Sequence, residues 1–116
     1  MPDSSLRLLK GTLDVLILKT VSWGPAHGYA ISRWIRESSA DDLVIQEGAL
    51  YPALRRLEES GWLASEWRRI DTGREARVYT LTPEGRQAMR AEVATWHRYV
   101  SAFTRVLETR PPEALA

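Results

Sequence analysis

The sequence predicts a mainly α-helical protein with one small β-hairpin and a long helix near its C-terminal end. Three stretches in the first half have apolar residues at helical spacing. Two short segments of alternating character then flank a polar turn that contains Gly73. The 116 residues suffice for one compact domain with an extended helix, and are too few for a barrel of eight βα units.

The first two helices are predicted over 12–22 and 28–38, with Thr12 as the N-cap of the first. The apolar face of the first helix has four members: Leu13, Leu16, Ile17 and Val21. The segment Trp23-Gly24-Pro25 ends this helix, because glycine and proline do not sustain it. The second helix has its own apolar stripe: Ala30, Ile31, Trp34 and Ile35.

A third helix is predicted over 47–60, after a polar loop and a short apolar run. Three leucines form its apolar face: Leu50, Leu54 and Leu57. Gly61 is placed to end this helix in the left-handed conformation. Pro52 lacks a backbone N–H, so we expect a distorted helix start.

The hairpin is predicted to have strands over 62–68 and 76–82, with the positive φ of its turn at Gly73. The segment Thr82-Pro83-Glu84 then combines an N-cap, a proline at the first helical position and a first-turn acid. The helix that starts there is expected to continue to about Glu108, before Pro111-Pro112. Residues 109–116 are expected to form a flexible tail.

Three helices followed by a hairpin form the element order of a winged helix-turn-helix. In that fold the third helix can enter the major groove of B-DNA, about 12 Å wide, while the hairpin, or wing, reaches phosphates. Candidate DNA-binding residues therefore lie off the leucine face of the third helix and on the wing. They are Gln46, Gly48, Tyr51 and Arg55 on the helix, and Arg68, Arg69, Arg74 and Arg77 on the wing. Gly48 permits a close approach of the backbone.

The kind of basic residue supports this interpretation more than the net charge of +1 does. Fourteen of the sixteen basic residues are Arg, and only Lys10 and Lys19 are Lys. Arginine suits two-pronged contacts to phosphate or guanine, although a GC-rich genome explains the same bias equally well.

The long helix carries a heptad pattern in which apolar residues are spaced 4, 3, 4, 3 and 4 apart. The members are Met89, Val93, Trp96, Val100, Phe103 and Leu107. We expect this face to form a homodimer that presents two DNA-reading heads about 34 Å apart, although the face can also pack on the core of its own domain. Trp96 is expected mainly as an interface residue, and its indole is also suited to stack on a flat aromatic effector.

Several classes of function are excluded or disfavoured by absent features. The chain has no cysteine, and therefore no disulfide, thiolate metal site or cysteine nucleophile. His27 and His97 lack metal-binding spacing, and no phosphate-binding loop or nucleophile elbow is present. We expect no metal, no cofactor and no enzyme activity. No long apolar run or signal-peptide pattern occurs, so a cytoplasmic location without membrane contact is expected.

Four stretches carry a family resemblance: LKGTLDVLIL at 9–18, HGYAI at 27–31, EGALYPALRRLE at 47–58 and YTLTPEG at 79–85. Over about residues 8–107, the chain closely resembles the PadR family of bacterial transcriptional regulators. The resemblance implies a winged-helix dimer that binds palindromic operators, usually as a repressor. The single C-terminal helix resembles that of the short subgroup, which dimerises through this helix and the first one.

The resemblance also implies roles for individual residues. Tyr29, with Gly48, Tyr51 and Arg55, matches the DNA-facing side, and the wing arginines match the phosphate-contacting hairpin. Trp96 matches a tryptophan that sandwiches flat aromatic compounds with its symmetry mate in multidrug-responsive relatives. The sequence departs from the family in two places. Family members often have Ser or Thr where this chain has Gln46 and Ala49, which puts the helix cap in question, although Gln46 is able to read adenine. Asp71 and Glu75 dilute the wing's positive charge.

The expected organisation is a DNA-binding domain over 1–82 and a dimerisation helix over 83–108. The main alternative is a winged helix that binds another protein and no DNA. The wing arginines, with Tyr51 and Arg55, favour DNA, because a protein-contact version would tolerate acidic or apolar residues there. A third possibility, a small-molecule sensor with little DNA affinity, depends on Trp96 and the heptad face.

Overall fold

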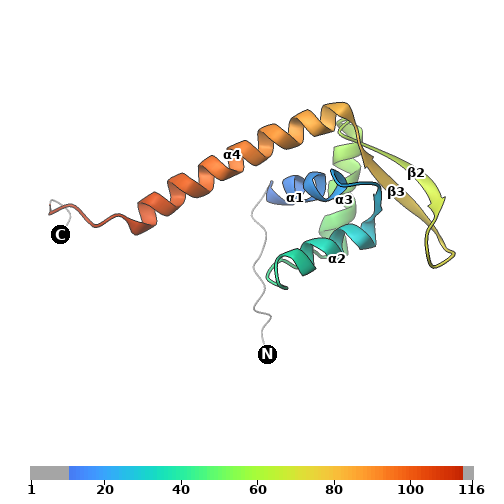
Figure 1. Ribbon diagram of the computed structural model, residues 1–116, viewed down its shortest axis with the longest axis horizontal. Helices are drawn as coiled ribbons and strands as arrows, with labels where there is room; N and C mark the ends of the chain where they lie inside the picture. The colour runs from blue at the N-terminus through green and yellow to red at the C-terminus, as the bar shows by residue number, and fades with distance from the viewer. Residues whose placement is uncertain (1–10, 114–116) are drawn as a thin grey trace.

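The computed structural model describes residues 11–113, which form four α-helices and a three-stranded antiparallel sheet (Figure 1). The helices are α1 (Thr12–Val21), α2 (Gly28–Ser38), α3 (Glu47–Glu59) and α4 (Pro83–Glu108). The strands are β1 (Ala26–His27), β2 (Leu63–Arg69) and β3 (Glu75–Leu81), in the order β1-β3-β2. The mainly helical winged fold predicted from the sequence is confirmed.

The core lies between α1, α2, α3 and the base of the wing. The predicted apolar faces supply it: Ile17, Ile31, Ile35, Leu50, Leu54 and Leu57 are each at most 2% exposed. Burying one such side chain contributes about 1.5–3 kcal/mol, so these faces hold the three helices together. Helix α4 joins the same core through Met89.

The turn between α3 and β2 is built as predicted. Gly61 has φ +80°, and its N–H donates to the carbonyl of Glu58 at 3.0 Å. The N–H of Trp62 donates to the carbonyl of Leu57, also at 3.0 Å, which completes a Schellman motif. This motif satisfies two carbonyls at the end of α3 and directs the chain into the wing.

Helix α4 starts against this turn. The Thr82 hydroxyl accepts the Gly85 N–H at 2.9 Å, which confirms the predicted N-cap, and donates to the Gly61 carbonyl at 2.6 Å. A Cβ on Gly85 would clash with the carbonyl oxygen of Trp62. Only glycine therefore lets the first turn of α4 pack this closely on the turn after α3.

Three points of the local prediction need correction. Thr12 is the first residue of α1 and not its N-cap; Gly11 takes that place with φ +89°, which costs glycine little. The wing strands are 63–69 and 75–81, each one residue away from the prediction. Strand β1 was not predicted, because two residues carry no alternation to detect. Separately from these corrections, Pro52 lies inside α3, which continues on both sides of it.

Helix α4 extends far from the body, at the opposite end of the molecule from the wing tip (Figure 1). The principal extents are 64 × 40 × 21 Å. The radius of gyration is 17.3 Å, against about 13 Å for a compact chain of this length, so the helix is a true projection. Among residues 11–113, no helix has the length and apolar character needed to cross a membrane.

Candidate DNA interface

An open groove of about 1020 Å³ lies between the start of α2, the middle of α3 and the wing. Six of the nine predicted DNA-binding residues line it: Tyr29, Tyr51, Arg68, Arg69, Arg74 and Arg77. The other three, Gln46, Gly48 and Arg55, are exposed on or beside α3 but do not line the groove. Residues from three elements that are far apart in the sequence therefore share one concave side.

Tyr51 is half-exposed on α3, and its position depends on Gly28 at the start of α2. A Cβ on Gly28 would lie 3.1 Å from the ring and hydroxyl of Tyr51, which is tighter than ordinary contact. Gly28 therefore leaves room for the Tyr51 ring. We did not predict this role for Gly28, although a glycine at a helix start indicates close packing.

Gln46 and Gly48 form the exposed start of α3. Gln46 is the N-cap residue, but its side chain makes no capping hydrogen bond, as the absence of Ser or Thr suggested. Apart from its chain neighbours and its own helix backbone, no residue in the described part of the chain comes within 4 Å of a Cβ built on Gly48. The protein's own packing does not explain a glycine there, which is consistent with a close approach by another molecule.

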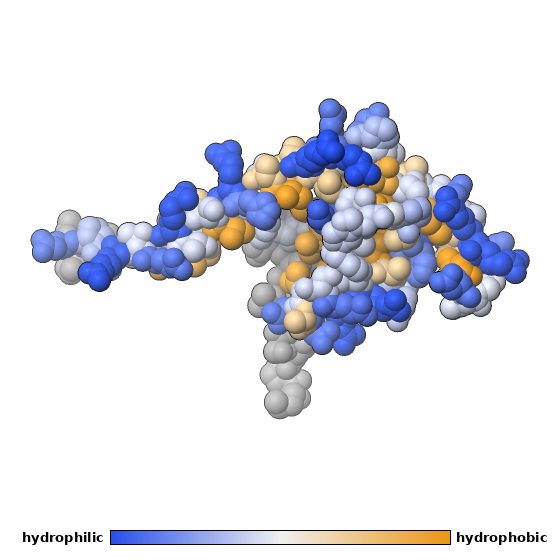
Figure 2. Space-filling view, in the orientation of Figure 1, coloured by the Kyte–Doolittle hydropathy of each residue, from blue (hydrophilic) through white to orange (hydrophobic). Residues whose placement is uncertain are grey.

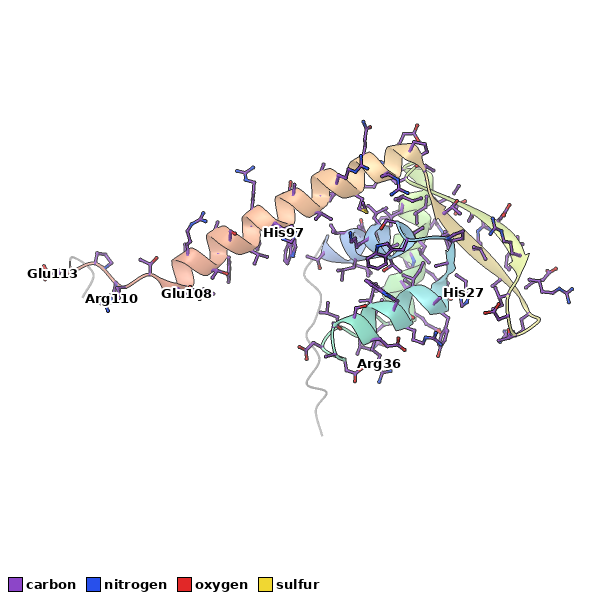
Figure 3. All side chains as sticks on the ribbon, viewed as in Figure 1. His27, Arg36, His97, Glu108, Arg110 and Glu113 are labelled. Atoms are coloured by element: carbon purple, nitrogen blue, oxygen red, sulfur yellow. The ribbon has the colours of Figure 1, made fainter. Side chains whose placement is uncertain are left out.

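His27 has a structural role that the sequence did not reveal. Its Nδ1 accepts the N–H of Ala30 at 3.3 Å and so caps α2. Its ring lies 6.5 Å from that of Tyr29, whose ring has the Arg33 guanidinium 5.8 Å away. Figure 3 places His27 at the start of α2 and His97 about midway along α4, so the two histidines do not form one site.

The wing arginines differ in how firmly they are held. Arg68 pairs with Glu66 on its own strand. Arg77 donates to the hydroxyl of Ser65 at 2.7 Å and pairs with Glu58 at 3.4 Å. Within the described part of the chain, the ion pairs do not include three of the candidate arginines: Arg55, Arg69 and Arg74. These three guanidinium groups are exposed and open to an anionic partner.

Tyr79 lines the groove and is 6% exposed. Burial raises the pKa of its phenol, and the negative charge of Glu58 and the hydroxyl of Tyr51 raise this pKa further. The positive charges of Arg77 and Arg55 lower it. Tyr51 of α3 and Arg77 of β3 both line the groove, so the candidate side chains of these two elements converge there.

The heptad face of α4 divides into two parts. Met89 is 8% exposed in the core of its own chain, and Val93 packs against that core. The other four residues of the heptad face are exposed, with exposed fractions that range from 37% for Trp96 to 70% for Leu107. Met89 is therefore occupied within the single chain, and the surface available to a partner begins near Val93.

Tyr99 widens this apolar surface, and we did not predict it. Its ring lies 5.5 Å from that of Trp96 and 5.8 Å from that of Phe103, both in stacked orientation. Tyr99 follows Trp96 by three residues, so the two side chains are neighbours on the helix surface. A search restricted to the heptad positions omits Tyr99. Figure 2 shows hydrophobic atoms along the part of α4 that projects from the body.

The fold and the groove define a winged-helix protein with a projecting helix. The profile of the family described as the transcriptional regulator PadR-like family matches residues 17–91. A crystal structure of a PadR family transcriptional regulator from Eggerthella lenta is 35% identical with a TM-score of 0.73, over 87% of this chain and 86% of that one. This chain belongs to the PadR-like family of transcriptional regulators.

Two further relatives agree with this assignment. A transcriptional regulator structure from Clostridium thermocellum is 30% identical with a TM-score of 0.75, over 83% of this chain and 93% of that one. A transcriptional regulator of Mycobacterium tuberculosis is 47% identical over 57 residues, which are 48% of this chain and 52% of that protein. The match thus spans about half the length of the Mycobacterium protein. The family consists of regulators and not enzymes, and membership implies DNA binding.

Proposed function

We propose that this chain is a homodimeric transcriptional repressor that binds a palindromic operator in the cytoplasm. The observation that carries the proposal is the convergence of Tyr29, Tyr51 and the wing arginines on one groove. Helix α3 would enter the major groove, and the wing would contact phosphates beside it. Arg55, Arg69 and Arg74 suit such contacts because they are exposed and take part in none of the ion pairs among residues 11–113.

The dimer is proposed from the exposed apolar surface of α4. The exposed fractions of Trp96, Val100, Phe103 and Leu107 mean that a single chain leaves this surface in water. A second copy would cover it by a two-fold arrangement, since the same face on both chains is self-complementary in a heptad seam.

A flat aromatic effector is the second component of the proposal. Trp96, Tyr99 and Phe103 already form a stacked series of rings on one side of α4. A planar compound would stack on Trp96 at the dimer seam and shift the spacing of the two DNA-reading heads. Quenching of tryptophan fluorescence together with release of DNA would support this, and quenching without release would contradict it.

The DNA-binding proposal is tested by fluorescence anisotropy with the duplex upstream of the protein's own gene and a shuffled duplex, across a salt series. We expect the native duplex to bind at least about 10³-fold more tightly, with steep salt dependence. Equal and weak binding to both would place the operator elsewhere. No binding to either duplex at low salt would favour the alternative, a winged helix that contacts another protein.

Substitution of Arg55 separates DNA contact from assembly. We expect Arg55→Ala to weaken operator binding by about 1–3 kcal/mol, because one guanidinium contact is lost. Arg98→Ala on exposed α4 is the matched control and is expected to leave binding unchanged. Sedimentation should show both variants as dimers, and a monomeric Arg55→Ala would overturn this separation of roles.

A further inference from the structure

Three side chains form a polar bridge between α3 and the wing, which we call the wing bridge: Glu58, Ser65 and Arg77. The Ser65 hydroxyl donates to Glu58 Oε2 at 2.8 Å and accepts from Arg77 Nε at 2.7 Å. Arg77 Nη2 also reaches Glu58 Oε2 at 3.4 Å. Each member therefore contacts the other two, and the three come from α3, β2 and β3.

The wing bridge lies where the wing leaves the body of the protein. Ser65 is the cross-strand partner of Tyr79, which is 6% exposed at the edge of the core. Two residues further along β2, Trp67 pairs with Arg77 and is already 65% exposed. Beyond this point the strands project from the helices (Figure 1).

A surface ion pair alone would contribute little, because Glu58 and Arg77 have side chains 32% and 45% exposed. The Ser65 hydroxyl adds two hydrogen bonds to this ion pair. Because the hydroxyl donates to Glu58 and accepts from Arg77, it restricts the direction of both hydrogen bonds. Strand β1 pairs with β3 at Tyr79 and Val78, and beyond these residues the wing is a two-stranded hairpin. Such a hairpin twists easily, so its angle depends on an anchor near its base.

We propose that the wing bridge fixes the angle of the wing against α3. Glu58 and Ser65, neither of which we placed among the DNA-contacting residues, are then positioning residues for DNA binding. Arg77 acts through the bridge as well, because its Nε and Nη2 are already engaged within the protein. The effect on DNA rests on the proposed function, whereas the effect on the wing angle does not.

The wing angle can be measured without DNA, because the chain contains no cysteine. Spin labels are attached to Thr72→Cys at the wing turn and Glu59→Cys on α3, two exposed positions outside the bridge. Pulsed electron–electron double resonance then gives the distribution of distances between the two spin labels. We expect Ser65→Ala to broaden this distribution. The control is Ser22→Ala, whose hydroxyl donates to the Lys19 carbonyl near the end of α1, outside the wing bridge, and it is expected to leave the distribution unchanged.

An unchanged distribution in Ser65→Ala would overturn the bridge, whatever the DNA measurements show. If Ser65→Ala broadens the distribution but the protein binds no DNA, the role of the wing bridge in fixing the wing angle is supported and the proposed function is contradicted. The melting temperature of each variant is measured alongside, so that a general loss of folding is separated from a local change at the wing.

The second measurement is operator affinity across a salt series. We expect Ser65→Ala to lower the affinity roughly five- to tenfold, because the wing is no longer held in its binding position, with an unchanged salt dependence. Arg77→Met, which keeps much of the side-chain stem, is expected to behave in the same way. If Arg77→Met lowers the slope of log affinity against log salt by about 1, Arg77 contacts a phosphate directly and the assignment is wrong. Unchanged affinity with a broadened wing would overturn the positioning role.

Discussion

At position 48, the lack of a side chain sets how closely the first turn of α3 can approach another molecule. A Cβ at Gly48 would meet open space among residues 11–113, so Gly48→Ala is expected to leave the melting temperature unchanged or slightly raised. The added methyl would face the DNA backbone or base edges and cost about 1–3 kcal/mol of binding free energy. Thermal denaturation and operator titration check both parts. Unchanged affinity would mean that this turn does not approach DNA closely.

The buried phenol of Tyr79 is expected to make the folded state lose stability at alkaline pH. Burial raises the pKa of its phenol above the ordinary 10.0, so the folded state holds this proton more tightly than the unfolded state does. The resulting stabilisation is present below about pH 10 and is lost as the pH rises through the raised pKa of the folded state. We expect Tyr79→Phe to lose less stability than the wild type between pH 9 and 11, measured by urea unfolding. An equal loss in both proteins would contradict this.

Among the elements, α4 joins a core contact to an exposed apolar surface within one helix of 26 residues. We expect Trp96→Glu to break the proposed dimer, because a charge at the seam must be desolvated without a partner. Ala94→Glu, exposed on the opposite side of the same helix, is the matched control and should remain dimeric. Sedimentation equilibrium distinguishes the single-chain mass of 13.2 kDa from twice that value. A dimeric Trp96→Glu would show that the seam lies elsewhere.

The whole molecule separates its two proposed contacts, with the projecting end of α4 far from the tip of the wing (Figure 1). In a two-fold dimer of this shape, the two reading heads would face half-sites about one DNA turn apart. Inserting five base pairs between the half-sites rotates one by half a turn, and we expect an affinity loss of about 10²-fold or more. The monomeric Trp96→Glu variant should be insensitive to the insertion. Equal binding of the dimer to both spacings would contradict a rigid two-headed dimer.

Local signals in the sequence determined most of the elements. The helical faces of α1, α2 and α3, the glycine at the end of α3, and the Thr82-Pro83 start of α4 each act within about one turn of chain, so their residues predict them directly. The composition of the candidate interface was also predictable, because exposed polar residues between buried apolar ones indicate the outer face of α3.

Only the tertiary structure decided how distant residues meet. The room that Gly28 leaves for Tyr51, strand β1 and the wing bridge each depend on contacts between segments that no local pattern relates. The same holds for Met89, which shares a heptad with exposed residues but is buried, because the body of the protein covers only the first part of α4. The period of a helix shows which residues share a face, whereas the packing of the other elements determines how much of that face remains exposed.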